Sequence, residues 1–493
     1  MATTSIALQK PFPFTDHHPK FRVAGWRELL GKEELMAAAE MVRHFLATGE
    51  TGSGKSVSAV MRLLESILRY PEEDLYEEYR AILGDKAESG ANLRPAVFVI
   101  DPKQELGELV DREARDRKVT RITYGEKGPV LHLFEGRDLS RLDAAEALEF
   151  ILLQSDFFVR DQASTREPSW NMQAATVLRD FIAVDMWLAK RSLDEVRELW
   201  GKTRAHMAQS EDYKAAAQSI CYDRCNYFKA MSTILSLSSS EHTSAALACY
   251  IEACHQMNVP GDLTVRFISL AAMYHPTRSG VLWMADGILA DIASDELAAC
   301  VSLNPIEAPP AENLISVKQI LDEGDVVVYI PTSGVSSIAE TVGRCLKSKF
   351  FEFAFERENK VRPFFYVVDE AHRFISAGEQ DGEQSLLDRC RAFRTGVVLS
   401  TQSIASMAHK LQGATGGGKN ALDIMLNNCG NALYFRTSDI RTQDNLRERI
   451  PRCPRPNGLH VINVRPLTTL PVGSCYATRC NGKWGLFQVH LPG

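Results

Sequence analysis

The sequence lacks the features of a membrane protein and of a secreted one. No run of about 18 apolar residues, the length that a membrane-spanning helix requires, occurs in its 493 residues. Residues 1–20 are mostly polar and are interrupted by prolines, so they do not form the apolar core of a signal peptide. We therefore expect a cytoplasmic protein that inserts no segment of its own into a membrane.

The sequence also lacks the excess of basic residues that marks many nucleic-acid-binding proteins. It has 56 lysines and arginines against 63 aspartates and glutamates, for a net charge of -7. DNA is not excluded as a partner by this balance, because a ring-shaped motor can enclose a basic pore within an acidic exterior. The sequence shows no internal repeat, and its length predicts two or three domains.

Nothing in the sequence indicates that its cysteines form disulfides. Because there is no secretory signal, the 11 cysteines are expected to be reduced thiols. The pairs Cys221/Cys225 and Cys249/Cys254 are spaced by close to one helical turn, in sequence that looks helical. Buried helical cysteines are the expected explanation, and a zinc site that also uses His255 is the alternative.

What the sequence does contain is a complete phosphate-binding loop of the form G-x-x-x-x-G-K-S. A short strand is expected at residues 43–48, and apolar residues at helical spacing follow over residues 57–69. Glycines let the backbone turn its N–H groups toward phosphates, Lys55 reaches the β and γ oxygens, and the Ser56 hydroxyl can ligate Mg²⁺. The predicted ATP-binding residues are Gly49, Glu50, Thr51, Gly52, Ser53, Gly54, Lys55 and Ser56.

A second motif supplies the acids that ATP hydrolysis needs. The apolar strand expected at residues 364–368 ends in Asp369 and Glu370, the Walker B pattern. We expect Asp369 to bind Mg²⁺, directly or through water, and Glu370 to orient and polarise the attacking water. Gln402 ends the next strand, at residues 396–401, and is expected to lie between the two motifs and to contact the γ-phosphate or the water.

Alternating strands and helices predict an α/β fold, that of a P-loop NTPase (RecA-like) with a mostly parallel sheet. The strand at residues 95–100 ends in Asp101, which is expected at the nucleotide-binding edge of the sheet. Strand signals nearly vanish between residues 140 and 302, where amphipathic helices dominate. The predicted divisions are a lead-in with a short helix at 32–42 (1–42), the first part of the ATPase domain (43–139), an inserted all-α domain (140–311) and the second part of the ATPase domain (312–493).

Two other motifs have different explanations. Residues 413–420 almost repeat the phosphate-binding loop, but Asn420 stands where the Mg²⁺ ligand should be, and a helix precedes it, so a flexible loop is expected. Residues 369–372 spell the motif of DEAH-box helicases. Those helicases hold this motif close to the phosphate-binding loop in one compact core, whereas Lys55 and Asp369 are more than half the chain apart.

The order of these motifs resembles the HerA–FtsK superfamily of ring-forming DNA-pumping ATPases, and most closely the TraG/TraD-type coupling proteins of conjugative type IV secretion. Four stretches carry the likeness: residues 49–56, 99–106, 366–374 and 390–402. Residues 43–130 and 312–450 resemble the family well, the insertion only loosely. Gln104 replaces the glycine of the family's D-P-K-G-E motif, and the membrane-spanning segment of most coupling proteins is missing.

The resemblance implies an ATPase that forms a ring, as a homohexamer, and moves DNA, with ATP and Mg²⁺ at the subunit interfaces. By spacing, Arg391 rather than Arg389 or Arg394 takes the position of the arginine finger, which acts on the nucleotide of the neighbouring subunit. Lys103 and the loop at 413–419 are candidates for pore contacts. The all-α domain would select the cargo or contact a protein or membrane complex.

Two alternatives of a different class remain open. One is an ATPase that recruits or remodels a protein for secretion, and the other is a nucleotide-gated assembly switch that hydrolyses ATP slowly. The sequence leaves open whether the DNA is single- or double-stranded and in which direction it moves.

Overall fold

The structure is a computed structural model that describes most of the chain between residues 20 and 489. It leaves out the segments 29–32, 71–75, 78–79, 81–83, 85–92, 115–116, 127, 129, 153–167, 240–243, 324, 332–336, 358–361, 377–381, 413–417 and 451–465. The loop expected at 413–419 therefore lies largely outside the described residues.

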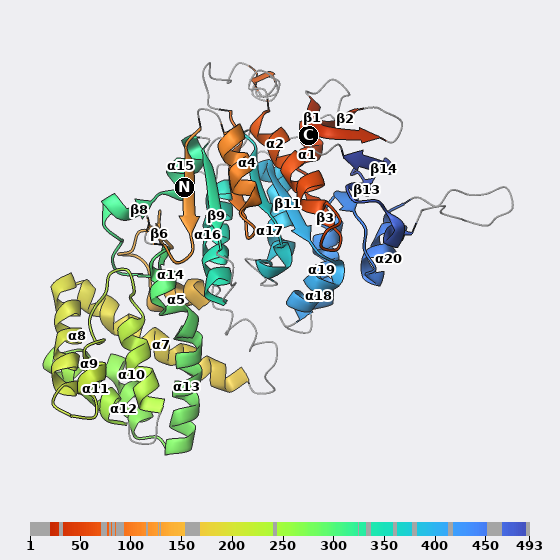
Figure 1. Ribbon diagram of the computed structural model, residues 1–493. Helices are drawn as coiled ribbons and strands as arrows, with labels where there is room; N and C mark the ends of the chain where they lie inside the picture. The colour runs from red at the N-terminus through yellow and green to blue at the C-terminus, as the bar shows by residue number, and fades with distance from the viewer. Residues whose placement is uncertain are drawn as a thin grey trace, which may run out of the picture.

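A run of parallel strands forms the larger part of an 11-stranded sheet and extends to one of its edges, β5 (Figure 1). Its order is β12–β3–β11–β10–β4–β9–β5. The bounds are β3 Phe45–Thr48, β4 Ala96–Ile100, β5 Val119–Thr123, β9 Val326–Ile330, β10 Phe364–Val368, β11 Thr395–Thr401 and β12 Asn431–Tyr434. Most of these strands are short, apolar and buried on both faces, as parallel strands covered by helices are. The predicted α/β fold is confirmed.

Helices cover both faces of this sheet. Side chains alternate along β10, so that Phe365 and Val367 join one hydrophobic core while Tyr366 and Val368 join the other. The first core includes α2 and α4, and the second includes α16 and α18. The helices of this part are α2 Met61–Leu68, α4 Glu105–Glu113, α15 Val317–Glu323, α16 Ser337–Glu356, α17 Glu383–Cys390, α18 Ile404–Gln412, α19 Gly418–Asn428 and α20 Ile440–Arg449.

Antiparallel strands extend the sheet beyond β12. A hairpin that turns at Asn481-Gly482, a favourable pair for a tight turn, joins β13 (Ser474–Thr478) to β14 (Trp484–Val489). Next to β14 lie β1 (Lys20–Glu28) and β2 (Glu33–Ala37).

The prediction of a helix at 32–42 is wrong for most of that segment. Residues Glu33–Ala37 form β2, and only α1 (Ala38–Met41) is helical. The segment EELMA consists of good helix formers, so propensity favours a helix, but its pairing with β1 overrides that weak preference.

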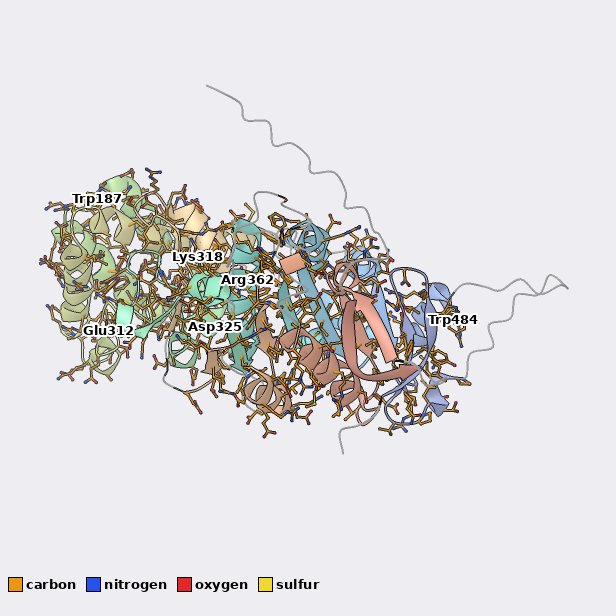
Figure 2. The ribbon with its side chains drawn as sticks, turned by 90° about the horizontal axis from the view of Figure 1, so that it is seen from above. Trp187, Glu312, Lys318, Asp325, Arg362 and Trp484 are labelled. Carbon is orange, nitrogen blue, oxygen red and sulfur yellow. The ribbon has the colours of Figure 1, made fainter. Side chains whose placement is uncertain are left out.

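A region of helices lies apart from the large sheet, at the lower left of Figure 1. Its helices are α5 Ala144–Leu152, α7 Pro168–Ala189, α8 Leu193–Met207, α9 Lys214–Ala217, α10 Lys229–Ser239, α11 Ser244–Gln256, α12 Gly261–Ala271, α13 His275–Ile292 and α14 Asp295–Ala298. A small parallel sheet of β6 (Val130–His132), β7 (Val301–Ser302) and β8 (Leu314–Ile315) stands where the chain enters and leaves this region. Figure 2 shows Trp187 of the helical region and Trp484 of β14 toward opposite ends of an elongated molecule.

Within the described residues, no helix combines the length and the apolar character that crossing a membrane would require.

Candidate active site

The phosphate-binding loop connects β3 to a helical segment that begins as a π-helix, η1 (Ser56–Val60), and continues as α2. Gly52 and Gly54 have φ angles of 79° and 88°, which residues with a Cβ rarely adopt. A Cβ on Gly54 would also lie 2.8 Å from the backbone nitrogen of Gly473. Position 54 therefore requires glycine both for its conformation and for space.

Several N–H groups at the start of the loop are used within the protein. Those of Gly49, Glu50 and Ser53 donate to the carbonyls of Thr401, Arg436 and Glu50, respectively, at 3.3, 2.9 and 3.1 Å. These bonds shape the start of the loop, and the expected binding of ATP by the three residues stays a prediction.

The C-terminal part of the chain supports the loop from outside. Arg436 pairs its Nε with Glu50 Oε1 at 2.6 Å, and the N–H of Gly473 donates to the Ser53 carbonyl at 3.0 Å. Sequence reasoning missed both supports. Arg436 could have been suspected because it directly follows a short apolar run at residues 432–435, whereas nothing in the sequence marks Gly473.

The two residues expected to hold Mg²⁺ meet although 313 positions separate them. Ser56 Oγ donates to Asp369 Oδ2 at 3.0 Å. Neighbouring ligands of an octahedral Mg²⁺ with bonds of 2.0–2.1 Å lie about 2.9 Å apart, so the two oxygens fit this ion by type and by spacing.

Asp369 stands at the centre of a charged network. Its Oδ1 accepts a hydrogen bond from Ser400 Oγ at 2.6 Å, a residue that sequence reasoning missed, and lies 3.8 Å from Lys55 Nζ. Burial alone would raise the pKa of Asp369, but the charges of Lys55 and Lys103 and the Ser400 hydrogen bond hold it below its usual value. Lys55 is only 4 % exposed, and its burial lowers its pKa against the opposing effect of Asp369 and Glu370. The carboxylate is therefore kept ionised, the form that binds a cation.

Glu370 has a left-handed backbone conformation, with φ of 52°. Such a conformation is costly for a residue with a side chain and is concentrated at functional sites. Its Oε2 accepts a hydrogen bond from Gln402 Nε2 at 3.1 Å and lies 3.7 Å from His372 Nδ1. Burial lowers the pKa of His372.

The sheet order explains how Gln402 reaches Glu370. Because β11 lies between β3 and β10, its carboxyl end emerges between the phosphate-binding loop and the Walker B acids. The structure thus places Gln402 between the two motifs, where the sequence placed it, and gives it Glu370 as its partner.

The strand β4 brings two further residues of the D-P-K motif to this edge, where Asp101 was expected. Asp101 is fully buried, and its Oδ2 accepts the N–H of Gly107 at 2.7 Å, so it caps the start of α4. Burial raises the pKa of Asp101. Lys103 pairs with Asp369 at 3.0 Å and with Glu370 at 2.9 Å, and its expected contact with a pore stays a prediction.

Arg391 lies near the amino end of β11, whereas the nucleotide site lies at the carboxyl ends of the strands. It begins η5 (Arg391–Phe393), the turn between α17 and the start of β11. The length of β11, about 20 Å at the usual rise, separates it from Gln402, so Arg391 cannot reach the site of its own chain. Arg389 lies 4.4 Å from the centre of the Phe355 ring, whereas the side chain of Arg391 is exposed and makes no hydrogen bond or ion pair with any residue that the structure describes.

A buried ion pair anchors the turn that follows the Walker B acids. Lys347 of α16 and Glu383 at the start of α17 approach to 2.7 Å, with both side chains 3 % exposed. Lys347 also donates to the carbonyl of Phe374 at 2.9 Å, and Glu383 accepts the N–H of Ser376 at 2.6 Å. The pair therefore joins α16, this turn and α17.

We expect Lys347→Met to destabilise the protein by roughly 3–5 kcal/mol, because it leaves the buried Glu383 carboxylate without its charged partner. Denaturant unfolding measures the loss. The matched control is Lys202→Met on α8, which removes an exposed pair with Glu198 and should change stability by less than about 1 kcal/mol. Equal unfolding midpoints for Lys347→Met and the wild type would contradict this assignment.

The cysteines form no metal site in the described parts of the chain. No group of three or more histidines, cysteines, aspartates or glutamates there could hold a metal ion. The expected helical setting is correct for Cys249 and Cys254 in α11 but wrong for Cys221 and Cys225, which lie between α9 and α10. There the carboxylate of Asp223 accepts the N–H groups of Cys225 and Asn226 and stabilises a turn.

Comparisons with known proteins give the fold and no sequence relative. No protein-family model matches the sequence, and no curated protein matches it. Among solved structures, the bacterial conjugative coupling protein TrwBΔN70 matches with a TM-score of 0.54 and 14% identity, over 93% of this chain and 87% of that chain. TrwB in complex with ADP and Mg²⁺ matches with a TM-score of 0.53 and 13% identity, over 93% and 88%.

The match covers the helical region as well as the sheet, since it spans 93% of this chain. It confirms, at the level of the fold, the resemblance to conjugative coupling proteins that the motifs indicated. The chain therefore has the fold of the conjugative coupling protein TrwB, a P-loop α/β sheet joined to a region of helices.

Proposed function

We propose that the chain is a Mg²⁺-dependent ATPase. The observation that carries the proposal is the contact between Ser56 and Asp369, which joins a phosphate-binding loop to a Walker B acid at the carboxyl edge of a parallel sheet. Ser56 and Asp369 would hold Mg²⁺, whose charge offsets that of the phosphate oxygens. Lys55 would bind the β- and γ-phosphates.

Within this proposal, Glu370 accepts a proton from the attacking water. Its Oε2 is fixed by Gln402, so the amide orients the carboxylate and keeps it ready for a water at the γ-phosphate.

We further propose that the chain works as a homohexameric ring that moves DNA. The support is the TrwB fold together with the position of Arg391, which is exposed and lies at the end of β11 opposite the nucleotide site of its own chain. In a ring, such an arginine can reach the nucleotide of the next subunit and stabilise the charge that develops during hydrolysis. The division into an ATPase domain and an inserted domain at 140–311 belongs to this proposal, with the inserted domain selecting the cargo.

Mixing two inactive variants tests the shared site. Lys55→Ala should lose nucleotide binding but keep its arginine, and Arg391→Ala should bind nucleotide but lose roughly 10³-fold in hydrolysis. A ring that contains both variants should recover part of the activity, because a wild-type site forms wherever Lys55 of one subunit faces Arg391 of the other. Arg389→Ala is the control and should stay close to the wild-type rate. An Arg391→Ala variant with the wild-type rate would contradict the role in trans.

A further inference from the structure

The ammonium group of Lys103 contacts three side chains that Mg²⁺-ATP chemistry requires. Its Nζ lies 3.0 Å from Asp369 Oδ2, 2.9 Å from Glu370 Oε1 and 3.3 Å from Ser56 Oγ. The first and the last of these oxygens are the pair that fits Mg²⁺. Lys103 thus lies against the same oxygens as the proposed metal site.

A lysine ammonium and a divalent cation cannot occupy the same side of one carboxylate. Both seek Asp369 Oδ2, and their like charges repel at the distances that shared oxygens impose. Lys55, by contrast, approaches the other oxygen, Oδ1, at 3.8 Å and does not block Oδ2. The two lysines therefore differ in role: Lys55 can stay when a metal binds, whereas Lys103 must leave.

The same contact restrains Glu370. Its Oε1 faces Lys103 at 2.9 Å while Gln402 holds Oε2 at 3.1 Å, so both carboxylate oxygens are engaged. An oxygen that already contacts an ammonium group is less accessible to an attacking water. Departure of Lys103 would free Oε1 for that water.

The surroundings let the side chain move while the backbone stays in place. Lys103 is 36 % exposed, and its stem ends in a compact charge that reorients easily. Hydrogen bonds hold the backbone on either side: Asp101 caps α4 through its side chain, and its carbonyl accepts the N–H of Gln104 at 3.4 Å.

We propose that Lys103 is an active-site latch that competes with Mg²⁺ for Ser56 and Asp369 and restrains Glu370 until the metal displaces it. This inference rests on the proposed ATPase function. It gives the D-P-K segment a role in the chemistry of the site, because Lys103 and the metal bind the same oxygens of Ser56 and Asp369 in turn.

Mn²⁺ alone, without nucleotide, is the probe for the latch, and electron paramagnetic resonance measures its binding to the full chain. Lys103→Met should bind Mn²⁺ roughly fivefold more tightly than the wild type, because the competing charge is gone. Lys103→Arg keeps a competing charge and should stay near the wild-type affinity, as should the distant control Lys202→Met. Asp369→Asn should abolish this binding, which would show that the measured Mn²⁺ is the one bound at Asp369. Equal Mn²⁺ affinities for Lys103→Met and the wild type would overturn the latch.

A second arm separates this inference from the proposed function. Wild-type protein with saturating Mg²⁺ should bind a fluorescent ATP analogue, and Lys55→Ala should not. If the wild type binds the analogue but Mn²⁺ affinity does not depend on Lys103, the latch alone is overturned. If the wild type binds no analogue, the proposed function is overturned, and the inference with it.

Discussion

Glu370→Gln is expected to reduce ATP hydrolysis by at least about 10²-fold while leaving the affinity for ATP within about threefold of the wild type. Glutamine matches glutamate in size and can still bond to Gln402, so the site should keep its shape. What it loses is the ability to accept a proton from water. Steady-state phosphate release and the binding of a fluorescent ATP analogue measure the two quantities separately.

The control for this variant is Glu198→Gln, an exposed glutamate on α8 far from the site, which should leave both quantities unchanged. A Glu370→Gln protein that hydrolysed ATP at the wild-type rate would remove Glu370 from the mechanism. A protein that lost binding as well as hydrolysis would show that the carboxylate supports the structure of the site rather than its chemistry.

Asp185→Asn is expected to stabilise the helical region, and to do so far more at pH 8 than at pH 5. Asp185 of α7 is fully buried and accepts hydrogen bonds from Trp200 Nε1 at 3.2 Å and Tyr227 OH at 3.0 Å. Burial raises the pKa of Asp185 to about 7, against the opposing effect of these two bonds.

The direction of the pH dependence follows from that raised pKa. The folded protein binds the proton of Asp185 more tightly than the unfolded chain does. This preference adds to the free energy of unfolding in full below the unfolded pKa of about 4, and the addition is lost as the pH rises through 7. For a pKa raised to about 7, the free energy of unfolding falls by about 4 kcal/mol between low pH and pH 8. Asparagine does not titrate and avoids the loss while keeping an acceptor for Trp200 and Tyr227.

Thermal unfolding followed by circular dichroism tests this prediction. At pH 8 the Asp185→Asn protein should melt roughly 5–10 °C higher than the wild type, and at pH 5 the gain should shrink to less than half of that. Asp194→Asn on α8 removes an exposed carboxylate and should show no pH-dependent gain. An Asp185→Asn protein with the same shift at both pH values would show that Asp185 does not titrate in this range.

The strands around the site could be predicted because each is a short apolar run that ends in a polar residue. Asp369 and Gln402 mark the ends of β10 and β11 in this way, and Lys55 belongs to a motif with fixed spacing. Parallel strands bring such ends to one edge of a sheet, so local patterns were enough to place these residues together.

The contacts that complete the site could not be predicted in the same way. Arg436, Ser400 and Gly473 reach it only because the sheet order puts their strands or turns beside β3 and β10, and no local pattern records that order. The contacts of Lys103 could not be predicted for the same reason: its motif was visible, but its approach to Asp369 depends on the pairing of β4 with β10.

The strands β1 and β2 were missed for a different reason. The segment Lys20–Glu28 mixes charged and apolar residues without a clean alternation, and Glu33–Ala37 favours a helix by composition. Their extended form depends on pairing with each other and with β14, near the other end of the chain. Local propensity is a poor guide to strands that are fixed by distant partners.

Steady-state ATP hydrolysis with and without DNA is the measurement that tests the proposed function most directly. If the chain is a DNA-moving ring, DNA should stimulate hydrolysis strongly, and the stimulation should vanish in both Lys55→Ala and Arg391→Ala. A rate that is the same with and without DNA, in protein that binds ATP normally, would contradict the motor and favour a protein as the cargo of the helical region.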